Sequence, residues 1–206
     1  MAETSRIIIP AALAFWIACL GCAPAGAQYY VAPSGTDNGV CTEAQPCTPQ
    51  GAVKLCFQPD GCRIDVADGD YPNPAIDIFY RRTVLMIGNC NNPAAVRLHA
   101  TQPNAVLITV QDHATAGLRC MTFDAEPTAT GVTGVMARQH VIVDYNMIGC
   151  GPLPGGVCFS ANEFSTVSCT QPSWLTGDFT TYIVASNFVK LNLHCEINTV
   201  IPIAFS

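Results

Sequence analysis

Four short apolar segments decide the fold of this chain, and they read Ile108-Thr109-Val110, Val135-Met136-Ala137, Val157-Cys158-Phe159 and Ile183-Val184-Ala185. Their first residues lie 27, 22 and 26 positions apart. Ten positions after each start comes a second apolar column, made of Leu118, Tyr145, Val167 and Leu193. Two short strands that recur at this interval indicate a winding chain, in which each turn covers the apolar face of the turn before it.

The chain before these segments follows a looser strand-and-turn pattern. Short apolar alternations predict strands at Ile64/Val66, Ile76/Ile78, Val84/Met86 and Val96/Leu98. One helix is expected, because Thr48 is a suitable N-cap and Pro49 suits the first helical position. The alternative architecture is a β-sandwich, which also has many short strands but need not keep a common register over four repeats.

The first 27 residues resemble a signal peptide, with Arg6 followed by an apolar run and small residues before Gln28. A membrane anchor is the alternative reading, although the run is short for a bilayer span. A lipidated Cys22 is another, because Leu20 and Gly21 precede it. We expect residues 28–206 to form one domain, secreted or periplasmic, with no membrane span after cleavage.

The formal net charge is −6, and Lys54 and Lys190 are the only lysines. Nucleic acids and anionic membranes are bound by clustered basic side chains. We therefore expect neither as a partner.

Ten cysteines follow the predicted leader, which indicates disulfides in an exported chain. Close spacing favours the pairs Cys41–Cys47 and Cys56–Cys62. The repeat alignment places Cys169 and Cys195 at equivalent inward positions, where they either bond or pack as thiols. A zinc site is not expected, because no C-x-x-C pair occurs after residue 27.

Three stretches of the sequence carry a family resemblance. Residues 29–37, 45–48 and 64–71 read YYVAPSGTD, QPCT and IDVADGDY. They resemble the entry region of pectin-lyase-like right-handed β-helix proteins. The resemblance implies an all-β fold: a short right-handed parallel β-helix of about six to seven coils, with an N-terminal capping helix.

The resemblance is specific for fold and not for activity. The carboxylate segments of the family's hydrolases are absent, and so is the Arg-x-Pro segment of its lyases. Val110-Gln111-Asp112-His113 only partly resembles a lyase segment. The apolar end, Ile201 to Ser206, is expected either to fold back as a cap or to meet another subunit.

The repeat alignment brings together one group of polar residues. Asp112 and His113 in one coil would lie beside Arg138 and His140 in the next. These are the weak candidates for binding an acidic sugar or for transferring a proton. A solvent-facing polar turn explains the same residues equally simply.

Two other features suggest ligands. Asp65, Asp68 and Asp70 crowd around Gly69 and are candidates for calcium, although Asp-Gly is also a plain turn signal. Trp174 could stack on a sugar ring or pack against the coils.

These observations predict an exported protein that binds polysaccharide or decorates the cell envelope without catalysis and without a cofactor. A small lyase or hydrolase acting on uronate-containing glycans is the first alternative. The second is a structural or adhesive module whose C-terminal ends associate into homo-oligomers.

Overall fold

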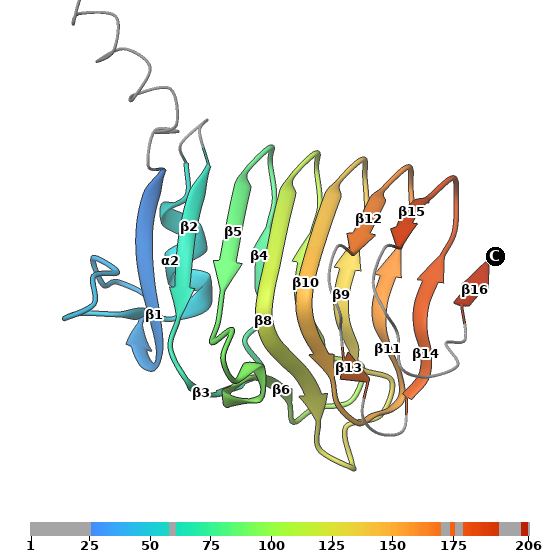
Figure 1. Cartoon of the computed structure of the whole chain (residues 1–206), viewed down its shortest axis with the longest axis horizontal. Helices are drawn as coiled ribbons and strands as arrows, with labels where there is room; N and C mark the ends of the chain where they lie inside the picture. The colour runs from blue at the N-terminus through green and yellow to red at the C-terminus, as the bar shows by residue number, and fades with distance from the viewer. Residues whose placement is uncertain (1–25, 58–60, 170–173, 176–178, 194–202, 206) are drawn as a thin grey trace, which may run out of the picture.

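The computed structural model describes residues 26–57, 61–169, 174–175, 179–193 and 203–205 (Figure 1). The predicted leader lies outside the described residues, apart from its last two positions. The first strand, β1 (Ala27–Thr36), begins one residue before the predicted mature start. The apolar C-terminal end contributes a strand, β16 (Ile203–Phe205).

The strands form two sheets, and every pairing among the described strands is parallel. The main path of the first sheet runs through β1, β2 (Cys62–Val66), β5 (Thr83–Ile87), β8 (Thr115–Ala125), β10 (Ile142–Cys150), β12 (Thr166–Cys169) and β15 (Lys190–Leu193). The second sheet runs through β16, β14 (Phe179–Ala185), β11 (Leu153–Ala161), β9 (Thr133–Ala137), β7 (Val106–Val110) and β4 (Ile76–Ile78). Figure 1 shows the chain passing repeatedly between these sheets along the long axis.

Strands β8 and β10 continue through a bend and pair a second time beyond it. The bends lie at Cys120 and Met147, whose φ angles are 60° and 52°. Beyond them, β6 (Val96–Ala100) lies between β3 (Gly69–Pro72) and the end of β8, and β13 (Trp174–Leu175) pairs with the end of β10. The first sheet is therefore folded along its length and offers two outer faces.

The register confirms that the predicted apolar columns are real, but the third repeat is displaced by two residues. Phe159, not Val157, lies between Val135 and Ile183. In the same way Cys169, not Val167, lies beside Tyr145 and Leu193. Corrected in this way, the repeat starts are 27, 24 and 24 residues apart and the ten-residue spacing between columns is kept.

The physical reason for the error is the period of a β-strand. Side chains alternate between faces, so a shift of two residues leaves the same side chains pointing inward and is invisible to an apolar pattern. The β11–β14 pairing contains an irregularity between Leu153 and Val157, which absorbs the shift. The equivalence of Cys169 with Cys195 is wrong for the same reason, because Cys169 pairs with Leu193. Cys169 is disulfide-bonded, whereas Cys195 lies outside the described residues.

The interior is a column of apolar side chains contributed by successive windings. All eight residues predicted as early strand pairs are buried. Farther along, the rings of Tyr145 and Phe159 stack with centroids 4.3 Å apart, and Phe123 meets Phe159 edge-on at 6.3 Å. Because each strand hydrogen-bonds to its neighbour on both sides, the backbone polar groups inside the stack are satisfied while the side chains exclude water.

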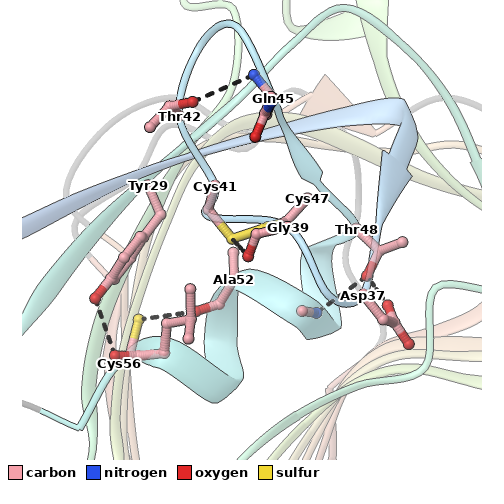
Figure 2. Close-up of a disulfide and its surroundings, with 12 residues drawn as sticks. Tyr29, Asp37, Gly39, Cys41, Thr42, Gln45, Cys47, Thr48, Ala52 and Cys56 are labelled. Carbon is pink, nitrogen blue, oxygen red and sulfur yellow. Dashed lines mark hydrogen bonds between the residues drawn. A yellow bond between two sulfur atoms is a disulfide. The ribbon is translucent and has the colours of Figure 1, made fainter.

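The N-terminal end is covered by the predicted helix, α2 (Pro49–Leu55), as Figures 1 and 2 show. Thr48 is its N-cap and its hydroxyl accepts a hydrogen bond from Gly51 N at 3.0 Å. The same hydroxyl donates to Asp37. The disulfide Cys41–Cys47 ties the preceding loop above the helix (Figure 2), and Cys56–Cys62 joins the helix end to β2.

Two further disulfides, Cys90–Cys120 and Cys150–Cys158, connect positions that spacing alone did not single out. The 3₁₀-helix η1 (Pro93–Ala95) follows Cys90. Among the described residues, no helix is long and apolar enough to cross a membrane. The observed structure is β-rich, parallel and disulfide-bonded, which is compatible with a β-helix and with an oxidising compartment. None of the strand pairs that the structure describes is antiparallel, as the pairs of a sandwich would be.

The corrected register makes a stability prediction. Phe159→Ala is expected to lower the free energy of unfolding by about 3–5 kcal/mol, because it removes a buried ring from the column. Val157→Ala, at a half-buried position, is expected to cost only about 1 kcal/mol. Urea denaturation of the oxidised protein measures both. Equal losses would contradict the register in which Phe159 fills the column.

Candidate functional site

A buried carboxylate, Asp124, organises a polar cluster on the described surface. Asp124 is 7% exposed. Its Oδ2 accepts hydrogen bonds from Arg97 Nε at 2.8 Å and from Arg97 Nη2 at 2.7 Å. Its Oδ1 lies 2.6 Å from His99 Nδ1. Charge-assisted contacts of this kind are strong, so the carboxylate fixes both partners in place.

Two exposed carboxylates complete the cluster at its edges. Asp70 Oδ1 accepts a hydrogen bond from Arg97 Nη1 at 3.0 Å, and Glu126 Oε1 lies 3.8 Å from His99 Nε2. The hydrogen bond to Asp124 is the main cause that raises the pKa of Arg97. The guanidinium therefore stays cationic while all three of its nitrogens are engaged by Asp70 and Asp124.

The strand register places these residues together. Asp70 on β3 pairs with Arg97 on β6, and His99 pairs with Asp124 on β8. The burial pattern of β6 alternates, so Val96, Leu98 and Ala100 enter the core and the two basic residues face outward. The cluster therefore spans three successive windings on one outer face.

A hollow of about 410 Å³ adjoins the cluster on the same face. The loop containing η1 forms one wall, and Thr122, Met147 and Gly149 form the floor. Thr122 is the register partner of Arg97 and donates a hydrogen bond to Pro93 O at 3.2 Å. The disulfide between Cys90 and Cys120 fastens the loop to the bend of β8.

Two glycines in the next winding make room for the side chains of Thr122 and Asp124. A Cβ atom added at Gly149 would lie 2.7 Å from Thr122 Oγ1, and one added at Gly151 would lie 2.8 Å from Asp124 Cβ. Both approaches are too close for any other residue without a shift. The side chains of Thr122 and Asp124 therefore pack closely over these two buried glycines.

The backbone of β13 lies beside the end of β10, because Trp174 is the register partner of Gly149. The residue predicted to stack on a sugar thus pairs with a residue that lines the hollow. The orientation of its side chain lies outside what the structure describes, so its role in binding stays a prediction.

The predicted group at positions 112, 113, 138 and 140 lies on a different edge of the molecule. His113 and His140 are neighbours, with ring centroids 5.2 Å apart and nearly parallel planes. Arg138 donates to Gln111 Oε1 through Nε at 2.9 Å and Nη2 at 2.6 Å. The juxtaposition of the two histidines is as predicted, whereas the functional role of the group remains untested.

These histidines belong to a longer ladder of stacked rings. His140 also stacks on Phe164 at 5.1 Å, and Phe164 stacks on Phe188 at 5.2 Å. Because ring faces meet ring faces along the axis, only Phe188, which is 84% exposed, is left without a following ring among the described residues. A sugar stacks on a ring face, so the inner part of this ladder is poorly suited to binding one. We interpret the ladder as a structural feature of the turns.

The turns that carry the ladder share an unusual backbone. In each, two consecutive non-glycine residues have φ angles near +60°, and the pairs are Tyr80-Arg81, Asp112-His113, Gln139-His140, Glu163-Phe164 and Asn187-Phe188. The strain is offset by hydrogen bonds between windings, such as His113 N to Gln139 O at 3.0 Å and His140 N to Glu163 O at 2.9 Å. The parallel hydrogen bonding between windings therefore continues from the strands through the turns.

The three predicted calcium carboxylates do not converge. Asp65 pairs with Arg63, Asp68 accepts from Asn89 Nδ2 at 3.0 Å, and Asp70 pairs with Arg97. Within the described part of the chain, no group of three or more His, Cys, Asp or Glu residues could hold a metal ion.

Sequence reasoning missed Arg97, His99, Asp124 and Glu126. The alternation Val96-Arg97-Leu98-His99-Ala100 does indicate that both basic residues leave the core on the same side. The sequence pattern did not indicate which carboxylate these residues contact. Asp124 lies 27 residues after Arg97, and only the strand register brings the two together.

No protein-family model, no curated protein and no solved structure matches the chain.

The strained turns generate a backbone prediction. Gln139→Val is expected to lower the free energy of unfolding by about 1–2 kcal/mol, because a β-branched residue is poorly tolerated at positive φ. Gln139→Gly is expected to leave stability within about 0.5 kcal/mol, since relief of strain offsets the looser unfolded chain. Thermal unfolding of both variants checks this. A Gly variant as unstable as the Val variant would show that the side chain, not the backbone, matters there.

A pH prediction comes from Asp77 on β4, next to the histidine edge. Burial is the main cause that raises the pKa of this carboxyl, although Arg138 opposes the effect. The folded protein therefore holds this proton to higher pH than the unfolded chain, and stability is lost as the pH rises through the folded pKa. Asp77→Asn removes that loss and can still accept from Gln111 Nε2, which lies 3.2 Å from Asp77 Oδ1.

We expect Asp77→Asn to raise the free energy of unfolding at about pH 7 by less than about 1 kcal/mol, and to have little effect at about pH 3. Urea denaturation at the two pH values measures the difference. If Asp77→Asn lowered the free energy of unfolding more at pH 7 than at pH 3, the raised pKa of Asp77 would be contradicted.

Proposed function

We propose that this chain is an exported, short right-handed parallel β-helix of about six to seven coils and of the pectin-lyase-like type. The parallel register, the recurring ten-residue spacing between columns and the capping helix support this architecture. The disulfides support export to an oxidising compartment, after removal of residues 1–27.

We further propose that it binds polysaccharide, at the cell envelope or outside the cell, on the face formed by β3, β6, β8, β10 and β13. The observation that carries this proposal is the hollow beside the Arg97–Asp124–His99 cluster. Sites for small ligands combine an apolar concavity with a few fixed polar groups. A chain of sugars fits such a face because it can cross several windings.

One observation favours an enzymatic alternative, a small lyase or hydrolase. His99 is held by Asp124 at one ring nitrogen, and its other nitrogen lies 3.8 Å from Glu126. An imidazole oriented by a carboxylate is suited to proton transfer. Binding without catalysis is still preferred, because Asp124 is committed to two partners and two convergent free carboxylates are needed for hydrolysis of a glycosidic bond.

The test compares two matched arginine variants in a polysaccharide-binding assay on the oxidised protein. Arg97→Gln is expected to weaken binding about tenfold, which corresponds to about 1.4 kcal/mol. Arg63→Gln is the control, because Arg63 also pairs with a carboxylate but lies away from the hollow. Asn91→Ala, on the exposed rim of the hollow, is a second variant that leaves the cluster intact.

Equal binding by all three variants and the parent, or no binding to any glycan, would overturn the proposal. The same samples incubated with polygalacturonate and calcium, while absorbance from unsaturated products is followed, test the lyase alternative. Product formation that is lost in His99→Gln would replace binding by catalysis as the function.

A further inference from the structure

We propose that the hollow binds an N-acetylated amino sugar and that the adjoining cluster discriminates against uronates. This inference rests on the proposed polysaccharide binding and names its ligand class. It is drawn from the charges around Arg97 and from the lining of the hollow.

The cluster beside the hollow carries a net negative charge. Asp70, Asp124 and Glu126 supply three carboxylates, and Arg97 supplies one fixed positive charge. With His99 neutral the cluster is negative by two charges, and with His99 protonated it is still negative by one. A uronate placed beside it would meet like charge, and partial desolvation strengthens that repulsion.

Arg97 uses most of its hydrogen-bonding capacity within the cluster. A guanidinium recognises a carboxylate best by donating two parallel N–H bonds from one edge. Here Nε and Nη2 are bonded to Asp124 and Nη1 is bonded to Asp70. Asp124 therefore already occupies the edge formed by Nε and Nη2, and Arg97 holds the two protein carboxylates.

The lining of the hollow mixes small apolar groups with neutral polar ones. Pro93, Ala94 and Met147 provide the apolar part, whereas Asn91, Asn92 and Thr122 provide amides and a hydroxyl. An acetamido group has the same composition, a methyl group joined to an amide. Burying such a methyl group contributes about 0.8 kcal/mol, and neutral polar groups can pair with its N–H and C=O.

The size and the floor of the hollow suit a sugar ring. The volume of about 410 Å³ lies within the range of small-ligand sites. Gly149 lines the hollow without a side chain of its own, so a ring can approach the floor beside Thr122 and Met147 with its acetamido group directed toward the η1 loop.

The test uses calorimetric titration of the oxidised, full-length exported protein with three tetrasaccharides: oligomers of N-acetylglucosamine, of glucose and of galacturonate. We expect the N-acetylated oligomer to bind at least about tenfold more tightly than the glucose oligomer. The galacturonate oligomer is expected to bind most weakly.

Two variants assign the preference to its cause. Ala94→Trp fills the hollow and is expected to abolish the advantage of the N-acetylated oligomer, whereas Asn38→Trp, on the distant exposed loop before Cys41, should leave it unchanged. The double variant Asp70→Asn/Glu126→Gln is expected to strengthen galacturonate binding several-fold while leaving the glucose oligomer unaffected. Both changes are at exposed positions, so the fold is not at risk.

The outcomes separate the two proposals. Binding of galacturonate or glucose oligomers in preference to the N-acetylated one overturns this inference and leaves polysaccharide binding in place. A preference for the N-acetylated oligomer that survives Ala94→Trp also overturns it, because the hollow is then not the site. No binding to any oligomer or polysaccharide overturns both.

Discussion

The structure depends on parallel pairing between windings at a fixed register. Each strand satisfies the backbone of its neighbours, and each inward side chain covers the one in the winding before it, as Tyr145 covers Leu118 and Phe159 covers Val135. No winding could bury its apolar face alone. The same pairing also continues through the strained turns, where backbone hydrogen bonds compensate for positive φ angles in residues that are not glycine.

The apolar columns could be predicted from the sequence because burial repeats with the windings. Positions such as Leu118 and Tyr145 must be apolar wherever the chain passes the axis, and they form neighbours in the sheet as expected. What the pattern could not determine was the register at Phe159 and Cys169. A shift of two residues preserves the inward face, so only the length of the intervening turn distinguishes the two alignments.

Outward residues carry much less information of this kind. The stacking of His113 on His140 could be predicted because both follow their strands at the same interval. The contacts of Arg97 with Asp124 could not, because no periodic constraint requires a charge at either position. Hydrogen bonds and charge pair these residues only after the apolar columns have set the register, so the candidate site is a consequence of the core.

This hierarchy explains why the face near Asp124 is the better candidate than the histidine edge. On the edge, stacked rings occupy one another's faces and the same turn geometry recurs in five of the described turns, which is what a structural ladder requires. On the other face the repetition is broken: a loop is fastened by a disulfide, two glycines make room for Thr122 and Asp124, and a carboxylate is buried. Stacking alone demands none of these departures, and together they create a concave surface with fixed polar groups. Ligand binding accounts for these departures from the repeat.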